Sequence, residues 1–341
     1  MPRPARTSVL AALALTALAL TSACSSSPGT TRTVSADGPD LSRVVLKVGD
    51  QVKLNQSVLE AAGELDDLPY RLEWASFTAG PPLLEALNAH AIDLGGTGDS
   101  PAAFAQASGA KLKVVAVQKG PGTDKVLVTK GSGITDVAGL RGKKVAVAKG
   151  SSAHGTLVGL LEKAHLSLSD ITPVYLAPPD ALSAFGSGKV DAWVVWNPYA
   201  AIGLTQAGGR QVADGTGISS GQSFVLASDR TLADPGKTAA ARDYVSRLAR
   251  ANAWANDHPE VWVPKYASLT GLPTSVAQTT FESSKGTYVP LDDDVAARQQ
   301  ALIERFRGAG LIKGSPKAAD FFDDRFDADV LAAQPSPAVT G

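Results

Sequence analysis

The chain has 341 residues, with 32 lysine and arginine residues against 33 aspartate and glutamate residues, and a net charge of −1 at pH 7. This balance lacks the basic excess with which proteins bind nucleic acid, so we expect no nucleic-acid partner. Hydrophobic residues make up 44% of the sequence, and its length is sufficient for two lobes that each bury a core.

The first segment, residues 1–23, has the pattern of a signal peptide. Two arginines precede an apolar run from Val9 to Leu20, which is too short to span a bilayer as a helix. The run leads to Leu-Thr-Ser-Ala-Cys, which resembles a bacterial lipoprotein cleavage site, so we expect Cys24 to be lipidated. Cys24 is the only cysteine, which excludes an internal disulfide and thiol catalysis in the mature chain. Residues 24–43 are expected to form a flexible tether.

Beyond residue 43 the sequence alternates between expected strands and helices. Short runs of β-branched and apolar residues predict strands at residues 44–48, 70–74, 92–94, 111–117, 125–129, 143–148, 172–176, 210–213 and 223–227. Amphipathic stretches predict the helices between them. This alternation is typical of α/β folds, in which a mostly parallel sheet carries helices on both faces.

Two stretches repeat the same order of elements. The first begins a helix at Gly-Pro-Pro 80–82, continues through the strand at 92–94 and begins another helix at Ser-Pro 100–101. The second begins a helix at Pro-Pro 178–179 and continues through a buried strand to Trp-Asn-Pro 196–198. βα units resemble one another in any α/β protein, but the shared order favours two similar lobes.

The lobes divide the chain into four parts. These are a first part of the first lobe at 44–130, the second lobe at 131–222, a return to the first lobe at 223–333 and a disordered tail at 334–341. The return is expected to be mostly helical, with helix starts at Pro259, Pro273 and Asp292. We expect most of it to pack against the outside of the first lobe and not to form the site.

The helix starts of both lobes suit an anion. Each leaves free backbone N–H groups and the positive end of the helix dipole. The relevant starts are at Gly80, Ser100 and Ser151–Ser152, where serine hydroxyls add donors. Gln51 follows the first strand, at the end where ligands bind in open α/β sheets. Three or four charge-assisted hydrogen bonds of about 1.5–3 kcal/mol each would approach the roughly −8 kcal/mol of a micromolar complex.

His154 follows two serines without completing a catalytic pattern. The sequence has no Gly-x-Ser-x-Gly motif, and it places no acid to orient the histidine ring. We expect a residue in the first helical turn whose ring donates a hydrogen bond to the ligand. His90, His165 and His258 lie at no metal-ligand spacing, so we expect no metal, no cofactor and no enzyme activity.

Several short motifs occur in order along the chain. They are Ala-Gly-Pro at 79–81, Leu-Glu-Ala-Leu-Asn at 84–88, Ile-Asp-Leu-Gly at 92–95, Thr-Gly-Asp at 97–99, Lys-Gly-Ser-Ser at 149–152, and Val-Asp-Ala-Trp at 190–193 followed by Trp196. Together they resemble the substrate-binding proteins of aliphatic-sulfonate ABC transporters and, less closely, the wider nitrate, sulfonate and taurine group. The resemblance spans residues 44–311. It implies a two-lobed type II periplasmic-binding-protein fold with the ligand cleft between the lobes.

The resemblance also implies a function, which is to capture a small sulfonate and deliver it to an ABC import permease. With Cys24 as anchor, we expect a monomeric, extracytoplasmic lipoprotein on the outer face of the bacterial cell membrane. The expected ligand-binding residues are Gln51, Gly80, Pro81, Pro82, Gly98, Asp99, Ser100, Ser151, Ser152, His154, Trp196, Asn197 and Phe224. Trp193 is out of step with Trp196 along the strand and is expected in the core.

Two positions depart from the family, and several alternatives stay open. Asn197 stands where the family commonly has aspartate, and Val-Lys-Leu-Asn 52–55 replaces a glycine-containing turn. Because asparagine carries no charge, the first departure favours a purely anionic ligand. Asp99 either caps the helix at Ser100 or faces the cleft, where it would bind an amine such as that of taurine. The alternative functions are the same fold binding nitrate, taurine, an aromatic sulfonate or a pyrimidine, an exported enzyme on this fold, and a sensory receptor.

Overall fold

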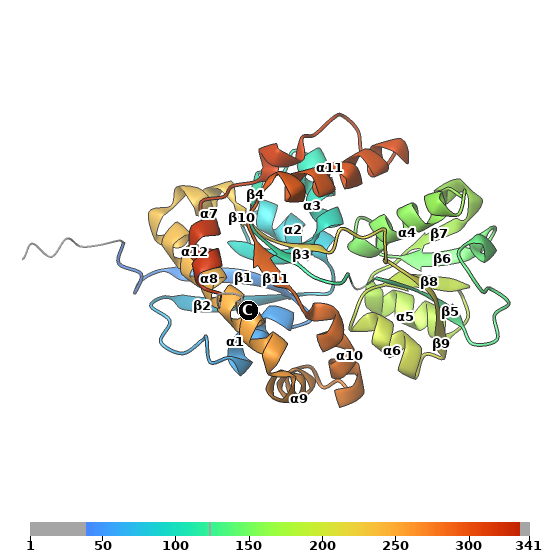
Figure 1. The fold of residues 1–341 in the computed structure, drawn as a ribbon, viewed down its shortest axis with the longest axis horizontal. Helices are drawn as coiled ribbons and strands as arrows, with labels where there is room; N and C mark the ends of the chain where they lie inside the picture. Colours follow the sequence, from blue (N-terminus) through green and yellow to red (C-terminus); the bar gives the residue numbers. More distant parts are fainter. Residues whose placement is uncertain (1–38, 123, 335–341) are drawn as a thin grey trace, which may run out of the picture. The chain divides into compact units, whose positions relative to one another are not determined.

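The computed structural model describes residues 39–122 and 124–334 (Figure 1). The expected signal peptide, the lipidated cysteine with most of the tether, and residues 335–341 of the expected tail lie outside the described residues. Within the described ranges, no helix is both long enough and apolar enough to cross a bilayer.

The first lobe is built on a six-stranded sheet. Its strand order is β11 (Thr287–Val289), β4 (Leu112–Lys119), β10 (Gln222–Ser228), β3 (Leu94–Gly98), β1 (Val45–Gln51) and β2 (Arg71–Phe77). β1 pairs in parallel with both β2 and β3, whereas β10 is antiparallel to β3 and β4. The sheet is therefore mixed and not mostly parallel, because the chain returns from the second lobe in the opposite direction.

The second lobe is built on a five-stranded sheet. Its strand order is β7 (Thr172–Tyr175), β6 (Lys144–Val147), β8 (Ala192–Val195), β5 (Lys125–Thr129) and β9 (Gly209–Asp214). β5 pairs with β8 and β9, so the boundary that we expected at residue 130 is wrong by one strand. The reason is that β5 buries Val126, Leu127 and Val128 in the core of the second lobe. In the first sheet β2, β1 and β3 are parallel and the neighbouring β10 is antiparallel to them. In the second sheet β7, β6 and β8 are parallel and the neighbouring β5 is antiparallel to them. This shared arrangement agrees with the repeat that we expected from the sequence.

Helices cover the faces of both sheets (Figure 1). The helices of the first lobe are α1 (Leu54–Ala61), α2 (Gly80–Asn88), α3 (Asp99–Ala107), α7 (Asp229–Ala233), α8 (Pro235–Asp257), α9 (Pro259–Thr270), α10 (Thr274–Ser284), α11 (Asp293–Gly308) and α12 (Asp327–Ala332). Those of the second lobe are α4 (Ser152–Lys163), α5 (Pro178–Gly186) and α6 (Tyr199–Gln206). One core cluster joins α1, α8, α9 and α10 to the first sheet, and another joins α2 and α3 to it.

A glycine-rich strand brings α2 close to the first sheet. We expected a strand at 92–94, but β3 begins at Leu94 and continues through Gly95 and Gly96. A Cβ atom on Gly95 would lie 2.4 Å from Cδ2 of Leu83, so only glycine admits that side chain. The leucine of α2 therefore packs directly on β3. α2 begins after the C-terminal end of β2, and α3 begins directly after the C-terminal end of β3.

The chain crosses between the lobes twice, before β5 and before β10. The Gly120 N–H donates to the Gly221 carbonyl at 2.9 Å, so the two crossings lie side by side. A Cβ atom on Gly221 would lie 2.3 Å from the Gly120 oxygen, and one on Gly120 would lie 2.4 Å from the Lys285 oxygen. These close backbone approaches require glycine at both crossings.

Candidate functional site

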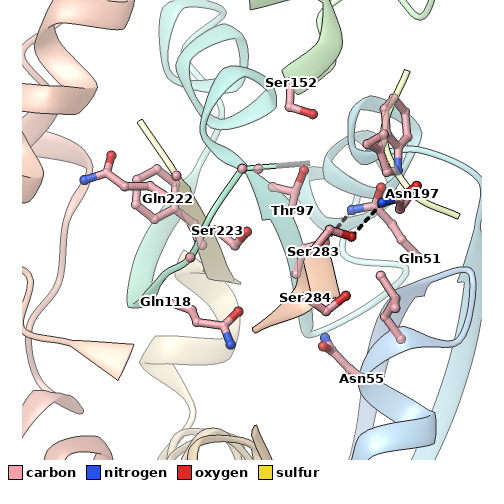
Figure 2. Close-up of a pocket in the computed structure, with 18 of the residues that line it drawn as sticks. Gln51, Asn55, Thr97, Gln118, Ser152, Asn197, Gln222, Ser223, Ser283 and Ser284 are labelled. Atoms are coloured by element: carbon pink, nitrogen blue, oxygen red, sulfur yellow. Dashed lines mark hydrogen bonds between the residues drawn. The ribbon is translucent and has the colours of Figure 1, made fainter. Parts of the chain in front are cut away.

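A cavity of about 220 Å³ is lined by residues from both lobes and from the two crossings (Figure 2). The first lobe contributes the ends of β1 and β3 and the starts of α2 and α3. The second lobe contributes the loop before α4 and the turn before α6. The residues that we expected in a binding site and that line this cavity are Gln51, Gly80, Gly98, Asp99, Ser151, Ser152, Trp196, Asn197 and Phe224.

Four expected site residues do not line this cavity. They are Pro81, Pro82, Ser100 and His154. The two prolines occupy the first turn of α2, and because proline has no N–H they remove donors that this helix start would otherwise offer. Ser100 lines a neighbouring cavity instead.

Thr97, which we did not expect in the site, is one of two lining residues with a buried side-chain atom that lacks a hydrogen-bond partner among the described residues, the other being Gln222. The Thr97 side chain is 4% exposed and lines the cavity, and its Oγ1 has no hydrogen-bond partner among the described residues. A Cβ atom on Gly80 would lie 2.0 Å from this oxygen, so the hydroxyl lies against the first residue of α2. A buried hydroxyl without a partner is costly, and at this cavity the Thr97 hydroxyl is available to a ligand.

The serine hydroxyls are engaged within the protein. Ser100 Oγ donates to Asp99 Oδ1 at 3.1 Å, Ser151 Oγ to the Ala148 carbonyl at 2.7 Å, and Ser152 Oγ to Asp124 Oδ1 at 2.9 Å. We expected these hydroxyl groups to donate to a bound anion, but in the structure they donate to oxygen atoms of the protein. The helix starts therefore offer backbone N–H groups, and Thr97 offers the free hydroxyl.

The Asp99 carboxylate serves the start of α3. Asp99 Oδ1 accepts from the Ser100 N–H at 2.6 Å, and Oδ2 accepts from Ser220 Oγ at 2.5 Å. Burial raises the pKa of Asp99, and burial raises the pKa of Asp124 to about 6 against the opposing hydrogen bonds from Thr156 and Ser152. These contacts favour a role of Asp99 at the start of α3 over the alternative role, in which its carboxylate would bind an amine of the ligand.

His154 is a packed residue of the second lobe. The ring is fully buried, and Nδ1 accepts from the Gly150 N–H at 3.1 Å. It lies parallel to the Phe104 ring at 6.1 Å and edge-on to Tyr175 at 5.5 Å. Burial, with a smaller contribution from Lys149, lowers the pKa of His154 to about 4. The ring therefore stays neutral near pH 7 and helps to hold the loop that carries Ser151.

We expect His154 to make folding stability depend on pH. Its folded pKa of about 4 lies below the value of 6.5 for an unperturbed histidine, so below pH 6.5 the unfolded chain binds a proton that the folded chain does not. Stability is lost as the pH falls from 6.5 towards 4, by roughly 2–3 kcal/mol at pH 4.5. Between pH 7 and pH 4.5, the free energy of urea unfolding should therefore change less favourably in the native protein than in His154→Phe, by roughly 2–3 kcal/mol.

The buried carboxyls act in the opposite direction and cancel in that comparison. Burial raises the pKa of Asp50 and of Asp124 to about 6, so these two groups make the folded state less stable as the pH rises through that value. Both are present in the native protein and in the variant. The exposed His90 provides a control, because His90→Asn should retain the pH dependence of the native protein. If the free energy of unfolding changed equally with pH in the native protein and in His154→Phe, the assignment would be contradicted.

Asn197 connects the two lobes across the cavity. Its Nδ2 donates to Ser283 Oγ at 2.7 Å, and its Oδ1 accepts from the Ala201 N–H at 3.1 Å (Figure 2). The first bond reaches α10 of the first lobe and the second holds the start of α6. An aspartate at this position could accept these bonds but could not donate one to α10.

The last third of the chain contributes more to the cavity than we expected. Its lining residues are Asn252, Ala255, Asn256, Trp262, Phe281, Ser283, Ser284, Lys285 and Tyr288. None of these nine residues was expected in the site, although most of this region does not line the cavity. One sequence signal was present, because Asn252 and Asn256 are four residues apart and share one face of α8.

Within residues 39–122 and 124–334, no three histidine, cysteine, aspartate or glutamate side chains are placed to hold a metal ion. Trp193 is 1% exposed and belongs to the core of the second lobe, as expected, while Trp196 lines the cavity. The cavity therefore combines amide and hydroxyl groups with aromatic walls, which suits binding.

The chain is similar to known proteins both in sequence and in fold. The profile of the family described as NMT1/THI5 like matches residues 81–261. An Escherichia coli K12 protein named for binding aliphatic sulfonates is 38% identical over 280 residues, covering 81% of this chain and 86% of that protein. The alkanesulfonate-binding protein SsuA of Xanthomonas axonopodis pv. citri, solved bound to MOPS, superposes with a TM-score of 0.77 at 34% identity, covering 85% of this chain and 100% of that one.

A more distant structure shares the fold alone. The desulfurization enzyme DszB superposes with a TM-score of 0.65 at 17% identity, covering 85% of this chain and 99% of that one. The same architecture therefore occurs in binding proteins and in at least one enzyme, so its chemistry depends on the residues that line the cavity.

Proposed function

We propose that this chain, which belongs to the NMT1/THI5-like family, captures a small sulfonate outside the cytoplasm and delivers it to an ABC import permease. The observation that carries the proposal is the buried Thr97 hydroxyl, which has no partner among the described residues and lies against the start of α2. The relatives named for binding sulfonates supply the ligand class.

The polar groups of the cavity suit a permanently ionised acid. A sulfonate needs hydrogen-bond donors and no partner that must titrate, and Thr97 with the N–H groups at the start of α4 can supply them. Asp50, Asp99 and Asp124 also line the cavity, and the hydrogen bonds that they accept from the protein offset part of their negative charge. Trp196 and Phe224 offer apolar surface to the carbon atoms of the ligand.

Thermal unfolding with a panel of ligands tests the sulfonate assignment. A ligand present at a hundred times its dissociation constant stabilises the folded state by about 2.7 kcal/mol. We expect ethanesulfonate and propanesulfonate to raise the melting temperature, and propylammonium to leave it unchanged. A rise with nitrate, uracil or an aromatic sulfonate but not with the alkanesulfonates would overturn the assignment in favour of another ligand on the same fold.

We also propose that the protein binds its ligand without transforming it. The hydroxyls of Ser151 and Ser152 donate to protein acceptors, and His154 does not line the cavity, so the histidine is not placed to activate a serine there. Incubation with an alkanesulfonate or its ester, followed by mass spectrometry, should return the compound unchanged. Turnover that disappears on substituting a cavity residue would establish an enzyme.

The attachment to the membrane is a separate proposal. We infer that residues 1–23 are removed, that Cys24 carries the lipid and that the mature protein is a monomer. The only cysteine of the chain stands at the end of the apolar leader, which supports this. Expression of Cys24→Ala in a bacterial host should move the protein from the membrane fraction to the soluble fraction. Retention of the variant in the membrane fraction would argue against the anchor.

A further inference from the structure

Part of the cavity is lined by side-chain amides, which indicates what the tail of the ligand carries. We call this part the tail chamber and define it by Asn55, Gln118, Asn252, Asn256 and Ser284, with Trp262, Phe281 and Tyr288 as its aromatic walls. In Figure 2 the labelled members Gln118, Ser284 and Asn55 lie on the side of the space away from Ser152. A chamber for a plain alkyl tail would need only the aromatic surface.

The hydrogen bonds of the tail chamber determine how two of its amides are oriented. Asn252 Nδ2 donates to the Leu248 carbonyl at 2.8 Å, and a carbonyl can only accept. The Asn252 oxygen is therefore the atom that faces Gln118, and it accepts from Gln118 Nε2 at 3.1 Å. This leaves Gln118 Oε1 as an acceptor, and no hydrogen bond among the described residues engages it.

Asn256 is oriented in the same way by a backbone carbonyl. Its Nδ2 donates to the Gly286 carbonyl at 2.9 Å, so its Oδ1 is the remaining polar atom. Within the described part of the chain, no hydrogen bond engages that oxygen either. The tail chamber thus offers two amide oxygens that need donors from the ligand.

We propose that the sulfonate carries hydroxyl groups on its carbon tail, which donate to Gln118 Oε1 and Asn256 Oδ1. The inference rests on the proposed function, since it assumes that the sulfonate group binds near Thr97. A plain alkyl tail would bury both amide oxygens without partners, and sites built to hydrogen-bond a hydroxyl discriminate strongly against analogues that lack it.

An ammonium group on the tail fits less well than a hydroxyl. Both acceptors are neutral amides, and Asp50, a buried acid of the lining, already accepts from the N–H groups of Asn55 at 3.1 Å and Gln56 at 2.9 Å. Lys285 also lines the cavity and would repel a second cation. The Lys285 ammonium lies 2.9 Å from Glu282 and 4.7 Å from the Phe281 ring centre, so it is held at this side of the cavity.

Three sulfonates of equal chain length test the inference. We would titrate the mature protein by calorimetry with propanesulfonate, 2,3-dihydroxypropanesulfonate and 3-aminopropanesulfonate. The dihydroxy compound should bind about tenfold to a hundredfold more tightly than propanesulfonate. Equal or tighter binding of propanesulfonate, or tightest binding of the amine, would overturn the inference and leave the proposed function intact. Failure of all three to bind would overturn the proposed function itself.

Variants of the two amides assign the effect to the tail chamber. In Gln118→Met and in Asn256→Leu, the ratio of the propanesulfonate dissociation constant to the dihydroxypropanesulfonate dissociation constant should fall about tenfold. Gln278→Met makes the same change at an exposed position of α10 and should keep the native ratio. Because both dissociation constants are measured on the same variant, their ratio reports the preference between the two ligands even if the variant is less stable. A ratio equal to that of the native protein in both variants would overturn the inference.

Discussion

Replacing Thr97 with valine should weaken sulfonate binding by about tenfold to a hundredfold without weakening the fold. Valine has the shape of threonine and suits a strand, but it lacks the hydroxyl that has no partner among the described residues. A hydrogen bond to a charged group is worth about 1.5–3 kcal/mol, which sets the expected loss of affinity. Calorimetric titration with a sulfonate measures it.

The free energy of unfolding separates this role from a structural one. Because valine removes a buried, unpaired polar group, the ligand-free variant should be as stable as the native protein or more stable by up to about 1 kcal/mol. Thr97→Ser retains the hydroxyl and should keep most of the affinity. If valine lowered stability and affinity together, the Thr97 hydroxyl would have a structural partner and the main support for the proposed function would be lost.

Gly80→Ala should reduce binding by more than about a hundredfold and lower the free energy of unfolding by about 1–3 kcal/mol. The added Cβ would lie 2.0 Å from Thr97 Oγ1 and 2.8 Å from Pro101 Cγ. Either the start of α2 or the threonine must move, and both lie at the cavity. Chemical unfolding and ligand titration of the same sample measure the two effects.

Two comparisons show that the effect comes from this contact. Gly133→Ala adds a methyl group where no atom lies within 4 Å, so it should change neither stability nor affinity. Adding Thr97→Ala to Gly80→Ala removes the closest clashing atom, and the double variant should regain part of the stability but not the affinity. Full recovery of affinity in the double variant would show that the threonine hydroxyl does not contact the ligand.

The starts of helices were predictable because they depend on local residues. Ser151 accepts from the His154 N–H at the start of α4, and Asp292 accepts from the Val295 N–H at the start of α11, both as expected from residue type. The cavity residues at the starts of α2, α3 and α4 and at the end of β1 were identified for the same reason. Such positions are determined by the few residues around them.

Thr97 was missed because the stretch around it does not look like a strand. Gly95, Gly96 and Gly98 weaken any strand prediction, and Gly95 is required because Leu83 of α2 packs against it. The amides of α8 were missed for a related reason, since they reach the cavity only when the last third of the chain returns to the first sheet. Contacts over such separations are not visible in local patterns.

The position of β10 between β3 and β4 has a consequence for the order of folding. Residues 125–214 contain every strand of the second sheet, so that lobe can form from one continuous segment. The first sheet lacks β10 and β11 until residues 222–289 join it, and pairing across such long separations is slow because the intervening loop must close. During refolding, the middle of the chain should therefore acquire its native structure before the segments that flank it.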